Sequence, residues 1–140
     1  MSFYTRIMSN GERKSDEVRG VSTKGEGMQY EPQKTLKEFN ELMTDIRQTI
    51  PEQYEAFIKG KDVLTKAGSV DEKTKWLLLL VSSVTQKCPV CIPRAVQHCL
   101  DMGWTKEQML EACMVAVLVG GSSTMTYVTL VDKTIADLSA

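Results

Sequence analysis

The sequence has almost no net charge, because 17 Lys and Arg residues oppose 18 Asp and Glu residues over 140 positions. A strong positive balance or a basic patch is what attracts a protein to nucleic acid or to an anionic membrane surface. No run of basic residues in this chain is longer than two. The composition therefore argues against nucleic acid or a membrane as a partner.

Long hydrophobic runs are also missing. The most apolar stretches are Trp76–Val81 and Ala112–Val119, far short of the ~20 residues that cross a bilayer. The first residues, Met1 to Gly11, lack the basic start and apolar core of a signal peptide. We therefore expect the protein in the cytoplasm, where thiols are kept reduced.

Cysteine and histidine are scarce, with four and one residues, but two of the cysteines form the motif Cys88-Pro89-Val90-Cys91. In a cytoplasmic protein such a pair is more often catalytic or metal-binding than a structural disulfide. The pair lies directly before a helical pattern. A helix N-terminus favours a thiolate, and a second thiol can then attack the oxidised first one. The pattern favours a redox-active pair.

Two other interpretations of the cysteines remain open. Free cysteine is often a small buried apolar residue, so the pair could simply pack in the core. Zinc is the other alternative, with Cys88, Cys91, His98 and Cys99 as ligands and Cys113 as a spare. However, Cys91 and His98 lie two helical turns apart, roughly 10 Å, which fits one ion poorly. We therefore expect no metal and no cofactor.

The chain divides into an N-terminal arm, residues 1–32, and a helical domain, residues 33–140. The arm is polar and shows no helical or strand period. We expect its few apolar residues to pack on the domain or on a neighbouring subunit; they are Phe3, Tyr4, Ile7 and Met8.

The domain shows helical periods and no strand alternation, which predicts an all-α fold. Six helices are expected: Pro32 to Ile50, Pro51 to Gly68, Glu72 through Val84, near Pro93 to Gly103, Thr105 to Gly120, and one from Ser122 or Ser123 through Leu138. Capping boxes are predicted at Ser69–Glu72 and Thr105–Gln108, and the first of these accounts for Glu72 without a role in the site.

The third and fifth of these helices are apolar on more than one face. A 140-residue chain has little interior for two such helices, and surplus apolar surface commonly lies at subunit contacts. We therefore expect a symmetric homo-oligomer.

Between Asp71 and Ile135 the chain resembles the carboxymuconolactone decarboxylase family, which includes the alkylhydroperoxidase D-like proteins. The similarity covers "VDEKTKWLLLLVSSVTQKCPVCIPRAVQHCLDMGWTKEQMLEACMVAVLVGG". It comprises the apolar helix, the CxxC at a helix entry, the "GWTKEQMLEA" helix start and the Gly-Gly that ends that helix.

This resemblance implies an alkylhydroperoxidase-like helical bundle that assembles as trimers or hexamers. It implies that Cys91 attacks a small hydroperoxide and that Cys88 resolves the product to a disulfide, which a dithiol reductant protein then reduces. The peroxidase branch also uses a Glu twelve residues before the first cysteine and a His four residues after the second. Trp76 and Ala95 stand at those positions here.

Without this relay, we expect a dithiol protein that performs thiol–disulfide exchange or slow peroxide reduction. His98 is a candidate auxiliary group, although a surface or interface position is the simpler explanation for it. Cys99 and Cys113 are interpreted as packing residues. The alternatives are a non-catalytic oligomeric protein, or a decarboxylase-type lyase whose lactone dicarboxylate substrate would need the positive charge of Arg94.

Overall fold

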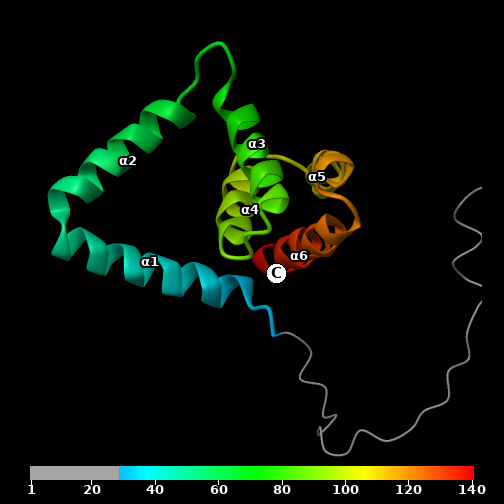
Figure 1. The fold of residues 1–140 in the computed structure, drawn as a ribbon, viewed down its shortest axis with the longest axis horizontal. Helices are drawn as coiled ribbons and strands as arrows, with labels where there is room; N and C mark the ends of the chain where they lie inside the picture. The colour runs from blue at the N-terminus through cyan, green and yellow to red at the C-terminus, as the bar shows by residue number, and fades with distance from the viewer. Residues whose placement is uncertain (1–28) are drawn as a thin grey trace, which may run out of the picture.

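The computed structural model describes residues 29–140 (Figure 1), and within this range the chain forms α-helices and no β-strand. The helices are α1 (Pro32–Thr49), α2 (Pro51–Thr65), α3 (Glu72–Thr85), α4 (Cys91–Asp101), α5 (Lys106–Gly120) and α6 (Ser122–Leu138). The predicted all-α fold of six helices is therefore confirmed. The expected packing of Phe3, Tyr4, Ile7 and Met8 concerns residues outside the described range.

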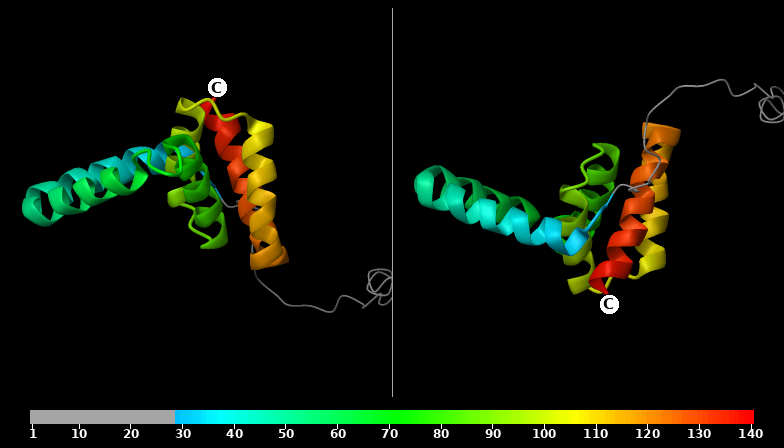
Figure 2. Two further views of the ribbon diagram at one scale, coloured as in Figure 1. Left: turned by 90° about the horizontal axis from the view of Figure 1, so that it is seen from above. Right: turned by 90° about the horizontal axis from the view of Figure 1, so that it is seen from below.

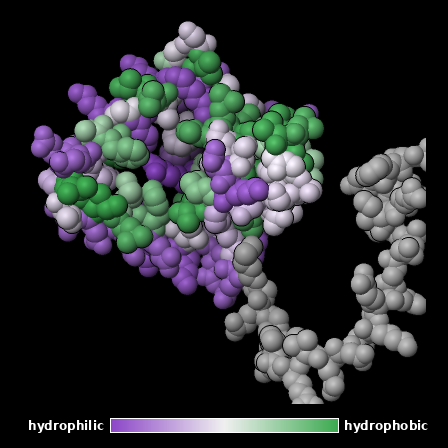
Figure 3. All heavy atoms as spheres, viewed as in Figure 1, coloured by the Kyte–Doolittle hydropathy of each residue, from purple (hydrophilic) through white to green (hydrophobic). Residues whose placement is uncertain are grey.

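Helices α3 to α6 pack together and enclose the core, whereas α1 and α2 form a hairpin that extends away from them (Figure 2). The core side chains come from α3, α4, α5 and α6; among the fully buried ones are Leu80, Val84, Ile92, Val96, Cys99, Met109, Cys113 and Val131. No residue of α2 is buried. The face seen in Figure 3 is hollowed between the hairpin and the packed helices, with apolar residues around the hollow.

The start of α1 is tied to the end of α6 by hydrogen bonds from Gln33 to Asp137. The backbone N–H of Gln33 donates to Asp137 Oδ2 at 3.1 Å, and its Nε2 donates to the Asp137 carbonyl at 2.8 Å. These bonds position the hairpin relative to the core.

Local capping chemistry sets two of the helix starts. The capping box at Thr105 and Gln108 is present as predicted. The one predicted at Ser69 is wrong: Asp71 caps α3 instead, accepting from the Thr74 N–H at 2.8 Å. An aspartate one residue before the helix competes with the serine for the same role, and its carboxylate also suits the positive end of the helix.

The turn between α5 and α6 also differs from expectation. Gly121, with φ of 73°, ends α5 and directly precedes α6, and neither Ser122 nor Ser123 caps α6 with its side chain. Gly120 has no room for a Cβ because the Thr124 side chain packs against it. The two glycines therefore allow the close approach of α6 to α5.

Helix α5 carries a large exposed apolar surface. Leu118 is 85% exposed, Val119 83% and Val115 58%. On α3, Leu78 is 54% exposed. Helices α3 and α5 are apolar on more than one face, so some of their hydrophobic side chains are exposed on the single chain.

Candidate functional site

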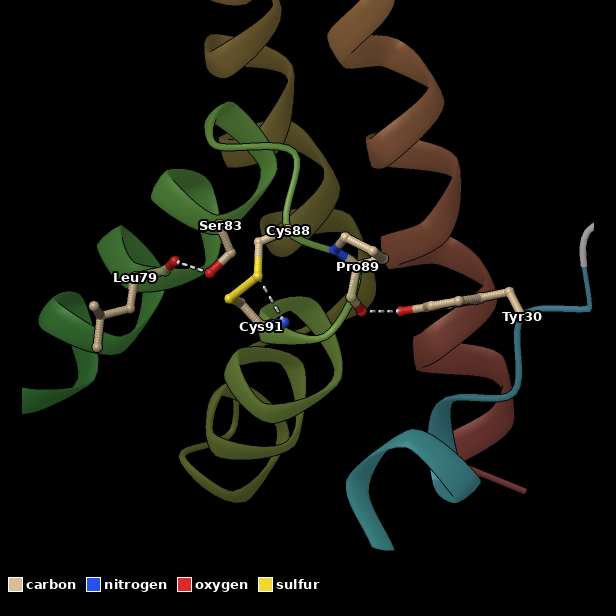
Figure 4. The surroundings of a disulfide bond; sticks show 6 residues. All are labelled: Tyr30, Leu79, Ser83, Cys88, Pro89 and Cys91. Atoms are coloured by element: carbon tan, nitrogen blue, oxygen red, sulfur yellow. Dashed lines mark hydrogen bonds between the residues drawn. A yellow bond between two sulfur atoms is a disulfide. The ribbon is translucent and has the colours of Figure 1, made fainter. Parts of the chain in front are cut away.

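Cys88 and Cys91 form a disulfide in the turn between α3 and α4, with their Cα atoms 5.3 Å apart (Figure 4). Lys87, the residue before the motif, has a left-handed φ of 55°, which turns the chain out of α3. Helix α4 begins at Cys91, two residues before Pro93, near which its start was predicted. The start lies earlier than expected because Pro93 fits in the first turn of a helix, where its missing N–H costs nothing.

Backbone hydrogen bonds hold Cys88 in the turn, and one of them reaches its sulfur. The Cys91 N–H donates to Cys88 Sγ at 3.2 Å and to the Cys88 carbonyl oxygen at 3.1 Å. The Cys88 N–H donates to the Ser83 carbonyl at 3.0 Å, which holds the turn against the end of α3. An N–H at a helix start directed at a sulfur favours its negatively charged form.

Tyr30 fixes the other side of the turn. Its hydroxyl donates to the Pro89 carbonyl at 3.3 Å (Figure 4). The same oxygen lies 3.0 Å from Thr134 Oγ1, which itself donates to the Leu130 carbonyl. Burial raises the pKa of the Tyr30 hydroxyl, so it stays a neutral donor at physiological pH. Tyr30, which is 59 residues before Pro89 in the sequence, thus holds the CxxC turn in place.

Cys91 lines a cavity of about 270 Å³. Its walls are mostly apolar and come from four helices and the CxxC turn; they include Phe39, Phe57, Trp76, Leu79, Val90 and Ala95. Trp76 and Ala95 therefore face the same space as Cys91. The two positions that carry proton-transfer residues in the peroxidase branch are at the cavity wall, and here both side chains are apolar.

Two cations, Lys61 and Arg94, also line this cavity, and none of its described lining residues is acidic. The Arg94 guanidinium lies over the Phe39 ring, 5.1 Å from the centroid. Lys61 Nζ contacts the exposed Asp62 carboxylate at 3.0 Å. The sequence pointed to Arg94 alone, so Lys61 is an addition.

His98 does not line the Cys91 cavity. Its imidazole stacks on the Trp76 indole with ring centroids 3.7 Å apart, and it lines a neighbouring pocket that shares Phe39 and Arg94. Burial, followed by the nearby Arg94 charge, lowers the pKa of His98. The side chain is partly buried, so a simple surface position does not describe it.

Cys99 and Cys113 are both fully buried thiols in the core. Burial raises the pKa of Cys99 to about 11 and that of Cys113 to about 12. Such thiols are protonated and unreactive near neutral pH. Their surroundings match the interpretation as packing residues.

The zinc alternative finds no support in residues 29–140, where no group of three or more His, Cys, Asp or Glu side chains is arranged to hold a metal ion. In the same range, no helix combines the length and apolar character needed to cross a membrane.

Sequence reasoning missed most of the cavity wall. Phe57 and Lys61 are four residues apart on α2, a spacing that places both on one helix face and could have marked them as a pair. Phe39 falls within the first predicted helix and Tyr30 within the predicted arm, and neither position by itself indicates a contact with the CxxC turn or its cavity. Phe39, Phe57 and Lys61 reach the Cys91 cavity because the α1–α2 hairpin folds back toward α4, and the sequence does not show how it folds back.

A sequence profile of the carboxymuconolactone decarboxylase family matches residues 51–133. The chain therefore belongs to the carboxymuconolactone decarboxylase family. No curated protein sequence matches it.

Solved structures agree with this assignment. A carboxymuconolactone decarboxylase family protein from Legionella pneumophila, solved in its apo form, superposes with a TM-score of 0.75 at 27% identity, covering 78% of this chain and 97% of that one. A Thermotoga maritima protein superposes with a TM-score of 0.70 at 25% identity, covering 76% and 94%. A second structure of the same Thermotoga maritima protein, described there as a carboxymuconolactone decarboxylase family protein with a suggested role in the antioxidative response, gives a TM-score of 0.67 at 25% identity, covering 76% and 90%.

Proposed function

We propose that the protein is a dithiol–disulfide oxidoreductase that reduces hydroperoxides through Cys91 and Cys88. The observation that carries this proposal is the bonded Cys88–Cys91 pair at the start of α4, with Cys91 lining a cavity. Family membership supports the same redox role, as does the antioxidative role suggested for a structural neighbour.

In the proposed reaction, the Cys91 thiolate attacks one peroxide oxygen and the O–O bond breaks. Cys91 becomes a sulfenic acid, and the leaving alkoxide takes up a proton to become an alcohol. The Cys88 thiolate then attacks the Cys91 sulfur, the S–O bond breaks, and the hydroxide leaves as water after protonation. The disulfide that results is the state seen in Figure 4.

Cys91 is assigned the attack because its side chain is exposed and lines the cavity. Cys88 is assigned the resolving role because the Cys91 N–H points at its sulfur, which favours the thiolate needed for that second attack. A dithiol reductant protein would return the pair to the reduced state by thiol–disulfide exchange. This cycle requires a reducing compartment, so we place the protein in the cytoplasm.

The cavity wall supports a slow version of this reaction. Trp76 and Ala95 offer no proton donor or acceptor where the peroxidase branch has its relay, and general acid–base help is typically worth about 10²–10⁴-fold in rate. Solvent or the Lys61 ammonium, which lines the same cavity, would have to supply the protons. His98 could assist only if the Trp76 stack rearranged, so its auxiliary role stays a prediction.

We further propose that the chain acts as a homotrimer or homohexamer. The exposed Leu118, Val119 and Val115 on α5 support subunit contacts at this surface.

The direct test is to expose the fully reduced protein to an organic hydroperoxide and to map the resulting disulfides by mass spectrometry. The proposal expects a Cys88–Cys91 disulfide in the wild type, and a sulfenic acid on Cys91 in Cys88→Ser. An inert pair would favour the alternative of a non-catalytic oligomeric protein. The lyase alternative would require turnover of a lactone by the Cys91→Ser variant, since it does not use the thiols.

A further inference from the structure

The cavity beside Cys91 combines two kinds of wall. Aromatic and aliphatic side chains from α1, α2 and α3 line most of it, among them Phe39, Phe57, Trp76 and Leu79. Such walls stabilise an apolar chain through the removal of its surface from water. Hydrogen peroxide is small and polar, so these walls contribute no binding free energy to it.

The second kind of wall is cationic. Lys61 comes from α2 and Arg94 from α4, and no acidic side chain lines the same cavity in the described part of the chain. Charge of one sign in an apolar, partly enclosed site is a recognition element for a ligand of the opposite sign.

Both cations are available to a ligand. Arg94 has no ion-pair partner among residues 29–140, and its stacking over Phe39 leaves the edge of the guanidinium free to donate hydrogen bonds. Among residues 29–140, Lys61 forms an ion pair only with the neighbouring Asp62, whose side chain is 64% exposed, and an exposed pair of this kind is worth little. Both cations line the same cavity, which brings them together although they come from different helices.

We propose that this cavity binds amphiphilic carboxylates, and that the hydroperoxides reduced at Cys91 belong to this class. Lys61 and Arg94 hold the carboxylate, the aromatic walls hold the alkyl chain, and the hydroperoxide group lies at Cys91 Sγ. The volume of about 270 Å³ lies just below the range of roughly 300–1,000 Å³ for small-molecule sites, which suits a short or medium chain. The hydroperoxide half of this inference rests on the proposed function, whereas the carboxylate half does not.

Calorimetric titration of the full chain with octanoate and with octan-1-ol tests the carboxylate half. The two probes share an alkyl chain and differ in charge. We expect octanoate to bind about tenfold more tightly, because it adds charge-assisted hydrogen bonds. The Lys61→Gln/Arg94→Gln double variant should lose this preference and keep its affinity for octan-1-ol.

Lys59→Gln is the matched control, because Lys59 is an exposed lysine of the same helix that does not line this cavity. It should keep the preference for octanoate. Equal binding of the two probes to the wild type, or an unchanged preference in the double variant, would overturn the inference.

Rates of Cys88–Cys91 oxidation separate this inference from the proposed function. We expect a hydroperoxide of a medium-chain carboxylic acid to oxidise the pair faster than its methyl ester, and the double variant to remove the difference. Equal rates for acid and ester would overturn the inference while leaving the proposed function intact. Octanoate binding without oxidation by either compound would uphold the carboxylate site and overturn the proposed function.

Discussion

The indole ring of Trp76 stacks on the imidazole of His98, with centroids 3.7 Å apart and an angle of 19° between the planes. This contact holds the single histidine of the chain against a wall residue of the Cys91 cavity instead of inside the cavity. It joins α3 to α4, and the Cys91 cavity has no imidazole among its described lining residues.

The Trp76–His98 contact predicts a pH-dependent stability. Burial and the Arg94 charge lower the native pKa of His98 below its unfolded value, which is about 6.5. As the pH falls through that value, the unfolded chain binds a proton that the native chain resists. Stability should therefore decrease from pH 7 toward pH 5. Urea unfolding should show a smaller decrease in His98→Gln, and equal decreases in both proteins would contradict this explanation.

The absence of the relay histidine predicts that restoring it accelerates hydroperoxide reduction. Ala95 lies at the cavity wall four residues after Cys91, so Ala95→His places an imidazole where the peroxidase branch has one. We expect hydroperoxide reduction to accelerate by about 10²-fold, because a positioned base and acid enters the reaction. Ala95→Gln, similar in size but unable to transfer a proton, is the control. Equal rates in the two variants, measured by stopped-flow with both confirmed as folded, would contradict the prediction.

Because Cys99 is a buried thiol, we expect its substitution to change the stability of the fold and not the redox chemistry of the Cys88–Cys91 pair. Cys99→Ser places a hydroxyl in an apolar core and should lower the free energy of unfolding by about 1–3 kcal/mol. Cys99→Ala keeps the site apolar and should cost less. Neither change should alter the rate at which hydroperoxide oxidises the Cys88–Cys91 pair. A slower oxidation in Cys99→Ala would assign Cys99 a part in the redox chemistry.

The exposed face of α5 predicts that assembly depends on Leu118. Leu118→Glu introduces a charge into the proposed subunit contact and should shift sedimentation from trimer or hexamer toward the single chain. Thr129→Glu, on an exposed position of α6, provides a control for the added charge. If the wild type sediments as a single chain, or if Leu118→Glu leaves its mass unchanged, the assembly proposal is wrong.

Features that depend on residues close together in the sequence could be predicted, whereas features that depend on residues far apart could not. The Thr105–Gln108 capping box was predictable because its two partners are three residues apart. Ser69–Glu72 also matches the capping-box pattern, and the sequence pattern alone does not show that the backbone makes Asp71 the cap of α3.

The candidate site followed the same rule. The resemblance to the peroxidase branch marked Trp76 and Ala95 as positions near the cysteine pair, and the structure brings both to one cavity with Cys91. Phe39 and Lys61 could not be placed in this way, because they reach that cavity through the fold of the α1–α2 hairpin. The Tyr30 contact to Pro89 depends on a still longer separation in the chain.

The most direct test of the redox role is a count of thiols in the fully reduced protein before and after one equivalent of an organic hydroperoxide. The chain has four cysteines, and the proposed function expects the thiols of Cys88 and Cys91 to disappear while those of Cys99 and Cys113 remain. The Cys91→Ser variant should keep its three thiols, because the attacking sulfur is absent. If all four thiols of the wild type survive the hydroperoxide, the central claim that this pair reduces hydroperoxides is wrong.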